Sequence, residues 1–500
     1  MSSWPRKMSK LSFADASAAG HVVAPAWQLS RPAALAAAAG AVGVAAGASV
    51  VLSEPVVPAI CIATSIACLA VLRWPFAGVP LFVVVAACLP FAVLPLRLVL
   101  APTLVDLVLT ALLISWVARV LHRDEMLVTS HLGLLVTLFI GLAVVALILG
   151  MSQSPISGET VRLFLKFVNS ALLFFSVVQV VRDDRQLATI VRTLLLVGGL
   201  AASLAVVLYG LPAEATLRLL SSLEVIGYPT AEVLRPVAGT DTLRATGTSV
   251  DPNILGALLM LVGVVLVAQL LARRPVLPRT LLGLIGAPVA LALALTYSRS
   301  SWVGLAAGLA FLAVGRSRRA GFVLALGAAA VVLVPPARAF IGRLGEAVSA
   351  TDPATVMRLA EYGNALQIIA RYPWFGIGFG SAPSIELAVG VSSVYLLIAE
   401  QMGLIGLACF IAIAFVALAR SVGTRPVRDS RLHGLLAAVE AAFFAALVAG
   451  LFDHYFFNIN FPHMVGVFWL VLGLLVVASR LASVAQERSE LTDIGQFGRR

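Results

Sequence analysis

Long apolar stretches alternate with short polar connections along almost the whole chain. The length of each stretch is close to that of a transmembrane helix, which needs about 20 residues to cross roughly 30 Å of hydrocarbon. Glycine, proline and charged residues separate the stretches, without the strict alternation of β-barrel strands. The pattern predicts an all-α polytopic membrane protein with about 14 transmembrane helices. We place these near residues 32–53, 55–72, 78–95, 101–120, 130–150, 162–181, 188–210, 252–272, 280–297, 300–315, 320–337, 393–419, 434–452 and 464–482.

Basic residues gather on one side of these spans. If the spans alternate in direction, the clusters around Arg73, Arg119, Arg273, Arg316 and Arg425 all fall in connections on the same side. The positive-inside rule assigns that side to the cytoplasm, so both termini are predicted to be cytoplasmic. The net charge of +11 is largely this topological signal, and we expect no binding to nucleic acid.

Polar segments divide the chain into three regions. Residues 1–31 are basic and lack a short apolar core followed by a cleavage site, so we expect a cytoplasmic N-terminal tail and not a signal peptide. Residues 32–482 form the predicted transmembrane domain, and residues 483–500 form a cytoplasmic C-terminal tail. Two outer loops, 211–251 and 338–392, are too long to be simple connections.

Composition agrees with a membrane protein and adds little chemistry. The 500 residues are 60% hydrophobic and only 12% charged, with a mean hydropathy of +1.02, which excludes a water-soluble globule. The four cysteines lie in apolar spans without the paired spacing of metal ligands. We therefore expect neither a metal site nor a cofactor.

The second outer loop contains a predicted amphipathic helix. Asp352 and Pro353 form an N-cap and first turn, and the helical pattern stops before Pro373. Arg358 and Glu361 lie on its polar side. Apolar residues recur at helical spacing at Val356, Leu359, Leu366 and Ile369. This pattern is typical of a helix that lies on a membrane surface.

A glycine-rich run follows this helix at residues 374–380. Three glycines at alternate positions allow backbone N–H groups to approach a ligand closely. Glycines in this arrangement also serve re-entrant turns, so the run alone does not define a site.

Several cations lie on the side that has few of them. Arg162 and Lys166 are four residues apart and share a helix face, Arg244 precedes a predicted helix start, and Arg299 and Arg358 lie in outer segments. Cations against the topological bias favour an anionic ligand, and guanidinium groups bind a diphosphate through paired hydrogen bonds. The alternatives are snorkelling at the interface or pairing with a nearby carboxylate.

These segments resemble a known family. The runs from Tyr297 to Gly304, from Arg358 to Gly380 and from Tyr395 to Gly406, with the stretch from Arg244 to Asn253, are similar to bacterial O-antigen ligases and O-antigen polymerases. The resemblance implies a metal-independent glycosyltransferase. It would sit in the bacterial cytoplasmic membrane, face outward, and act on glycans carried by undecaprenyl diphosphate.

One departure from the family pattern affects the expected reaction. Many ligases of this family have a His-Asn pair where this chain has Ser392 and Ser393. The departure favours a polymerase that joins oligosaccharide repeat units of a surface polysaccharide. The alternative is a ligase that transfers the glycan to a lipid or protein acceptor.

Glycosyl transfer from a lipid diphosphate needs charge relief at the departing diphosphate. We assign Arg244, Arg299 and Arg358 to that role, with Arg162 and Lys166 as outer members of the site. Holding donor and acceptor together supplies much of the remaining rate enhancement.

The reaction also needs a base for the acceptor hydroxyl, and the candidates are Glu361, Asp453 and His454. Glu361 is alternatively an ion-pair partner of Arg358, and His454 is alternatively a helix cap or interfacial anchor. Asp106 is a further carboxylate within an apolar span, and the sequence assigns it no role.

Two other classes of protein remain as alternatives. A transporter or flippase of lipid-linked glycans would also be polytopic, but its charged residues should lie near the membrane midplane on broken helices. A scaffold of a cell-envelope assembly would not need cations that converge on one point. The expected partners of the enzyme are the lipid-linked glycan, the bilayer, and a polysaccharide flippase or chain-length regulator.

Overall fold

The computed structural model of the chain describes residues 56–94, 102–121, 131–153, 156–229, 234–237, 241–333, 353–380, 391–424 and 430–497. The chain divides into two compact units, residues 1–65 and residues 66–500. The predicted span 32–53 and the predicted N-terminal tail lie outside the described residues. The arrangement below is that of the second unit.

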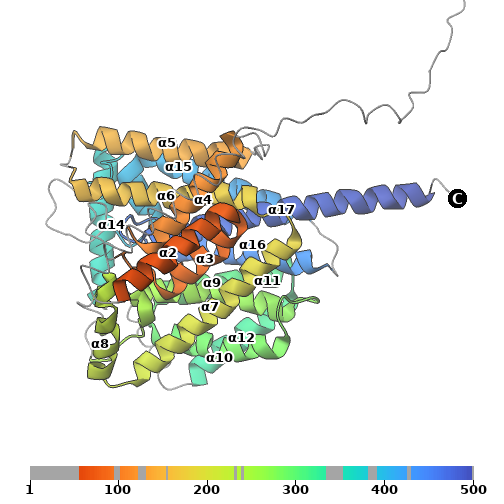
Figure 1. The fold of residues 1–500 in the computed structure, drawn as a ribbon, viewed down its shortest axis with the longest axis horizontal. Helices are drawn as coiled ribbons and strands as arrows, with labels where there is room; N and C mark the ends of the chain where they lie inside the picture. Colours follow the sequence, from red (N-terminus) through yellow and green to blue (C-terminus); the bar gives the residue numbers. More distant parts are fainter. Residues whose placement is uncertain are drawn as a thin grey trace, which may run out of the picture. The chain divides into compact units, whose positions relative to one another are not determined.

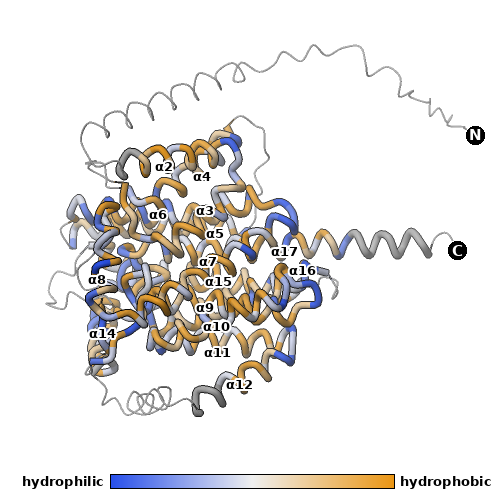
Figure 2. Tube along the Cα trace, turned by 60° about the horizontal axis from the view of Figure 1, so that its bottom comes forward, coloured by the Kyte–Doolittle hydropathy of each residue, from blue (hydrophilic) through white to orange (hydrophobic). Residues whose placement is uncertain are grey.

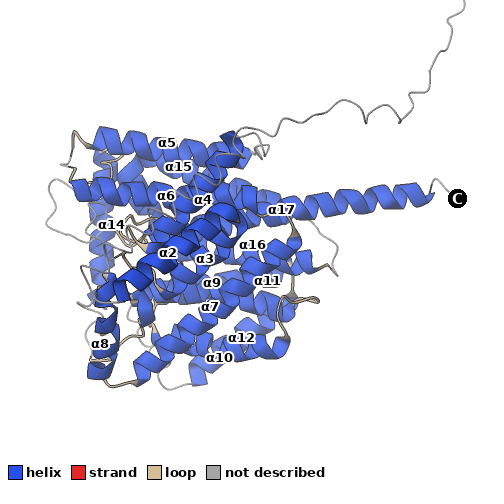
Figure 3. Ribbon diagram, viewed as in Figure 1, coloured by secondary structure: helices blue, strands red, loops and turns tan. Residues whose placement is uncertain are grey.

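The described residues fold into helices, without a β-strand among them (Figure 3). The helices of the first half of the chain are α2 (Val56–Arg73), α3 (Pro75–Cys88), α4 (Leu104–Leu121), α5 (His131–Gly150), α6 (Gly158–Val180), α7 (Asp184–Gly210) and α8 (Ala213–Ser221). The later ones are α9 (Pro252–Leu271), α10 (Arg279–Leu295), α11 (Arg299–Gly315), α12 (Arg318–Leu333), α14 (Pro353–Arg371), α15 (Val394–Gly423), α16 (Arg431–Ala449) and α17 (Pro462–Phe497). Two short 3-10 helices, Ser222–Ile226 and Gly247–Ser249, lie between α8 and α9.

Eight of the described helices are long and apolar enough to cross a membrane, namely α4, α5, α6, α7, α9, α15, α16 and α17. Shorter apolar helices include α3, α10 and α11. Figure 2 shows hydrophobic residues along the bundle helices and hydrophilic ones at α8 and α14. The predicted class, a polytopic α-helical membrane protein, is confirmed. The number of fourteen spans and the cytoplasmic position of both termini stay predictions.

Side-chain caps fix where several helices begin. Ser157, Asp183 and Ser430 each accept a hydrogen bond from a backbone N–H in the first turn of α6, α7 and α16. Asp251 accepts hydrogen bonds from the amides of Asn253 and Ile254, and Pro252 occupies the first helical position of α9. These are the residue types that satisfy the free N–H groups of a helix start.

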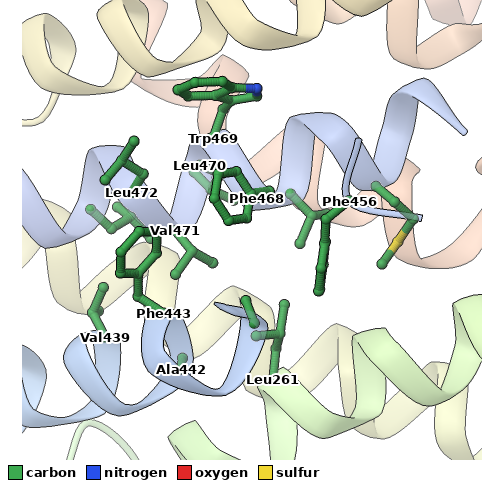
Figure 4. Packing of buried hydrophobic residues seen from close by; sticks show 14 of the residues in the cluster. Leu261, Val439, Ala442, Phe443, Phe456, Phe468, Trp469, Leu470, Val471 and Leu472 are labelled. Carbon is green, nitrogen blue, oxygen red and sulfur yellow. The ribbon is translucent and has the colours of Figure 1, made fainter. Parts of the chain in front are cut away.

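The three helices α9, α16 and α17 form the centre of the bundle. In each of them 78% of the most apolar stretch is buried, compared with 28% for α5. Phe443 of α16 packs against Phe468 of α17 with ring centroids 5.6 Å apart, and Leu261 of α9 belongs to the same cluster (Figure 4). Tilted aromatic pairs of this kind add stability beyond their buried area.

Small residues allow α11 to approach α16 closely. A Cβ atom at Gly304 would lie 2.9 Å from the Cβ of Ala449, and one at Gly308 would lie 2.9 Å from the Cβ of Ala445. Small residues four apart are typical of close helix packing in membranes. The contact holds the first turn of α11 beside the end of α16.

Two amphipathic helices lie across one end of the bundle. In Figure 1, α8 and α14 run across the direction of the bundle helices, and α14 contacts α15. Leu359 and Leu366 of α14 are more than half exposed, whereas Glu361 and Ala365 are buried against the protein. The helix therefore turns its polar side inward and its apolar side outward, as expected for a helix in contact with membrane lipid.

The spanning helix α15 is broken at Gly403, where φ is 68° and ψ is −177°. The carbonyl groups of Glu400 and Gln401 accept hydrogen bonds from the amides of Ile377 and Gly378. The amide of Leu404 donates in turn to the carbonyl of Pro373. The glycine-rich run thus serves as a strap that forms hydrogen bonds with the backbone groups at the break in α15. This role agrees with the re-entrant alternative.

The last helix is longer than its predicted span. The apolar stretch of α17 was expected to end at residue 482, but the helix continues to Phe497. Residues 485–488 read Ala-Gln-Glu-Arg, and these residues have high helix propensity, so a polar helix extends beyond the bundle.

We predict that Gly403→Ala destabilises the protein by about 3 kcal/mol. A Cβ atom there would lie 2.1 Å from the carbonyl oxygen of Trp374, and its backbone conformation is nearly restricted to glycine. The midpoint temperature of unfolding in detergent should fall accordingly. Gly141→Ala is the matched control, because a Cβ at that position of α5 meets nothing within 4 Å. An equal midpoint for both variants would show that the break does not depend on glycine.

Candidate functional site

The site forms at the end of the bundle where α11 and α15 begin and α16 ends, under α14. We call this the site end. At its centre the carboxylate of Asp453, which is 4% exposed, lies in the turn after α16. It accepts hydrogen bonds from the Ser300 hydroxyl at 3.2 Å and from the His454 amide at 2.9 Å. Arg358 of α14 forms an ion pair with it at 3.9 Å.

Arg244 lies in the segment between α8 and α9 and is within electrostatic range of this carboxylate. Its guanidinium donates to the Thr296 carbonyl and to the Asn253 side-chain oxygen, both at 2.7 Å. Burial is the main reason that the pKa of Arg244 is lowered, to about 10; Asp251 and Asp453 oppose the shift, whereas Arg358 and Arg235 add to it. Arg244 is therefore charged at neutral pH, and Arg358 and Asp453 both lie within its electrostatic reach.

Arg299 occupies the first position of α11 and contacts α14. Its Nη1 donates to the Thr355 hydroxyl at 3.4 Å, and Thr355 precedes Arg358 by one helical turn. The structure thus pairs Arg358 with Asp453, places Arg244 within electrostatic range of both, and places Arg299 beside the helix that carries Arg358. All three predicted cations belong to the site end.

Glu361 is buried and contacts the segment before α15. Its Oε2 accepts hydrogen bonds from the Ser392 hydroxyl at 2.7 Å and from the Ser392 amide at 3.1 Å. The neighbouring Tyr362 donates to the Ser392 carbonyl at 3.0 Å, and burial raises the pKa of its phenol. Among the described residues Glu361 forms no ion pair with Arg358. Its carboxylate is hydrogen-bonded to Ser392 instead.

His454 lies next to Asp453 at the edge of the site. Its Nδ1 is 3.9 Å from the Asp453 carboxylate and 3.4 Å from the side-chain nitrogen of Asn458. The ring stacks on Phe461 with an interplanar angle of 16°. With 19% of its side chain exposed, His454 remains accessible to a ligand.

A cluster of buried hydroxyl groups lies beneath the cations. Ser298 contacts Ser300 at 3.2 Å and Ser301 at 2.9 Å, and all three are at most 1% exposed. Tyr455 is also buried there, and burial raises the pKa of its phenol. We did not predict this cluster, although several serines at the start of an apolar helix are a signal that deserved weight.

The two remaining predicted cations belong to other contacts. Lys166 pairs with Asp106 at 2.7 Å, and both side chains are largely buried. Arg162 pairs with Glu159 at 3.1 Å. Asp106 thereby gains a role as the counter-charge of Lys166. Both cations are therefore paired with carboxylates, which is one of the alternatives that the sequence left open.

No group of three or more His, Cys, Asp or Glu side chains in the described part of the chain is placed to hold a metal ion. The candidate site contains three arginines, two carboxylates and several hydroxyls. Cations exceed carboxylates, so the arrangement favours an anionic ligand with several oxygen atoms.

The fold and these contacts describe a polytopic helical membrane protein with a cluster of arginines, carboxylates and hydroxyls at one end of its bundle. Residues 281–411, about a quarter of the chain, match the family model for O-antigen ligase. The matched segment contains Arg299, Arg358, Glu361 and Ser392. The match confirms the resemblance found in the sequence and supports glycosyl transfer of the O-antigen ligase type. A comparison with curated proteins gives no match.

Proposed function

We propose that this protein is a membrane polymerase that joins oligosaccharide repeat units carried by undecaprenyl diphosphate. The proposed reaction takes place on the outer face of the bacterial cytoplasmic membrane and needs no metal ion. The observation that carries the proposal is the ion pair between Arg358 and the buried carboxylate of Asp453. Arg244 lies within electrostatic range of both, and Arg299 bonds to Thr355, one helical turn before Arg358.

The arginines serve the departing diphosphate. As the bond between the anomeric carbon and the phosphate oxygen breaks, the diphosphate keeps the electron pair and gains negative charge. Guanidinium groups that are already aimed at this position stabilise that charge by about 3–4 kcal/mol each. Their positions are held by Thr296, Asn253 and Asp453, so little reorganisation is needed.

Asp453 serves to orient these cations in the proposal. The hydrogen bonds from Ser300 and His454 fix the position of its carboxylate, and its ion pair orients Arg358. A carboxylate that is needed to hold Arg358 in place should not leave it during the reaction.

Glu361 is the base in the proposal. Both hydrogen bonds from Ser392 end on its Oε2, so its Oε1 can accept the proton of an acceptor hydroxyl. The oxygen of the acceptor hydroxyl then forms the new bond to the anomeric carbon as the diphosphate leaves. His454 is a second candidate, because its ring is partly exposed beside Asp453.

The serine at position 392 favours a polymerase over a ligase. It occupies the place where many ligases have histidine, and Glu361 and Tyr362 hold it at its amide, hydroxyl and carbonyl groups. Transfer to a lipid or protein acceptor is the alternative reaction. A flippase or chain-length regulator is the expected protein partner.

A flippase of lipid-linked glycans is less consistent with the geometry. Transport sites lie near the membrane midplane between repeats. Here Arg299 is the first residue of α11, and Asp453 follows the end of α16, so the charges gather at helix ends. A scaffold would not require this convergence.

The proposed role of the arginines can be tested by substitution. Replacing Arg244, Arg299 or Arg358 by Ala should lower polymer formation in cells by about 100-fold or more, since each removes one pre-aimed donor. Arg→Lys should restore little, because lysine cannot form the paired hydrogen bonds of guanidinium. The measurement is the length distribution of extracted polysaccharide at equal membrane protein level.

A double variant, Asp106→Asn with Lys166→Met, is the matched control for these arginines. It removes a buried ion pair as a unit, so that no charge is left alone, and it should keep polymer formation. Wild-type polymer from both Arg299→Ala and Arg358→Ala would refute the proposed role of the arginines.

The next prediction concerns the base. Glu361→Gln keeps the size of the side chain and an oxygen for Ser392 but cannot accept the proton, so the rate should fall by about 100-fold or more. The purified protein should keep its unfolding temperature within a few degrees. If the variant retains the full rate, Glu361 is not the base and His454 becomes the candidate to replace.

Deletion of the protein distinguishes polymerase from ligase. The glycan on the lipid carrier should accumulate as single repeat units, because a polymerase consumes those units. Mass spectrometry of the extracted carrier lipid gives the chain length. Accumulation of full-length chains would show a ligase instead.

A further inference from the structure

A second surface feature lies away from the site, between α5 and α15. A groove of ≈ 490 Å³ opens there, lined by Leu134 and Leu135 of α5 and by Phe415, Val416 and Ala419 of α15. Its volume is in the range of about 300–1,000 Å³ that binding pockets have. Because α15 begins at the site end, the groove near its last turns lies toward the opposite end of the bundle.

The walls of the groove are suited to hydrocarbon. Leu134 is 70% exposed and Phe415 is 71% exposed, although both belong to helices that can span a membrane. α5 is also the least buried of the eight candidate spans, since it packs chiefly against α15 at the edge of the bundle. These side chains therefore face membrane lipid.

One end of the groove is polar. Arg420 near the end of α15 and His131 at the start of α5 complete its lining, and both are exposed. Within the described residues neither side chain has a carboxylate partner. A cation at the end of an apolar groove between spanning helices matches the chemistry of a phospholipid, with the acyl chain along the helices and the headgroup at the arginine.

We propose that this groove binds an anionic phospholipid of the leaflet on the arginine-rich side, with its phosphate at Arg420 and an acyl chain between Leu134 and Phe415. A zwitterionic lipid fits the apolar walls equally well, but its positive group is repelled by Arg420. Charge complementarity therefore selects a headgroup with net negative charge, by roughly five-fold for one arginine at the surface. The site is independent of glycosyl transfer.

The test uses the full chain in vesicles of phosphatidylcholine. Phe415→Trp places a fluorophore in the groove at an exposed position, and the fluorescence of the unaltered chain is subtracted because the chain has 7 tryptophans. Brominated phosphatidylglycerol or brominated phosphatidylcholine is added at the same mole fraction. The expected result is roughly five-fold enrichment of the anionic quencher over the zwitterionic one.

Three further variants decide the outcome. Adding Arg420→Ala to Phe415→Trp should remove the preference, and adding Arg420→Lys should retain it, since only charge is required. Leu200→Trp, on the exposed face of α7, should show no preference and serves as the matched control. Equal quenching by both lipids at Phe415→Trp, or a preference that survives Arg420→Ala, would overturn the proposal.

Discussion

The buried carboxylate of Asp453 determines the arrangement of the candidate site. A carboxylate that is removed from water is costly unless charged and hydrogen-bonding groups surround it. Ser300, the His454 amide and Arg358 supply those groups, and Arg244 lies within its field. The ion pair holds Arg358 at the carboxylate, and Thr296 and Asn253 hold Arg244 nearby, although like charges repel. The counter-charge and the cations therefore position one another.

This cluster depends on how closely the helices pack. Gly304 and Gly308 bring α11 against the alanines of α16, so that Ser300 at the start of α11 reaches Asp453 after the end of α16. The strap at residues 373–378 is bonded to the break in α15 and follows α14 directly, so it fixes the end of the helix that carries Arg358. Rigid supports of this kind limit the motion of catalytic groups.

The sequence predicted the class of fold well, because membrane spans depend mainly on local hydrophobicity. The amphipathic helix from Pro353 to Arg371 was also predicted closely, since proline and the apolar spacing mark both of its ends. Pairing was harder to predict. Lys166 and Arg358 look alike as outer cations, and only the packing of α4 against α6 shows that Asp106 neutralises the first.

The role of the glycine-rich run could not be predicted from the sequence either. Its amides donate hydrogen bonds to the carbonyls of Glu400 and Gln401 because α15 breaks at Gly403. A single glycine in a long apolar helix does not predict such a break. The hydrogen bond between Glu361 and Ser392 joins residues that are 31 positions apart in the sequence, so no local sequence pattern predicts it.

The most direct test is an experimental structure of the purified protein with a prenyl diphosphate bound. Diphosphate density between Arg244, Arg299 and Arg358, next to Asp453, is the result that we predict. Density at another end of the bundle, or arginines that point away from the bound diphosphate, would contradict the account.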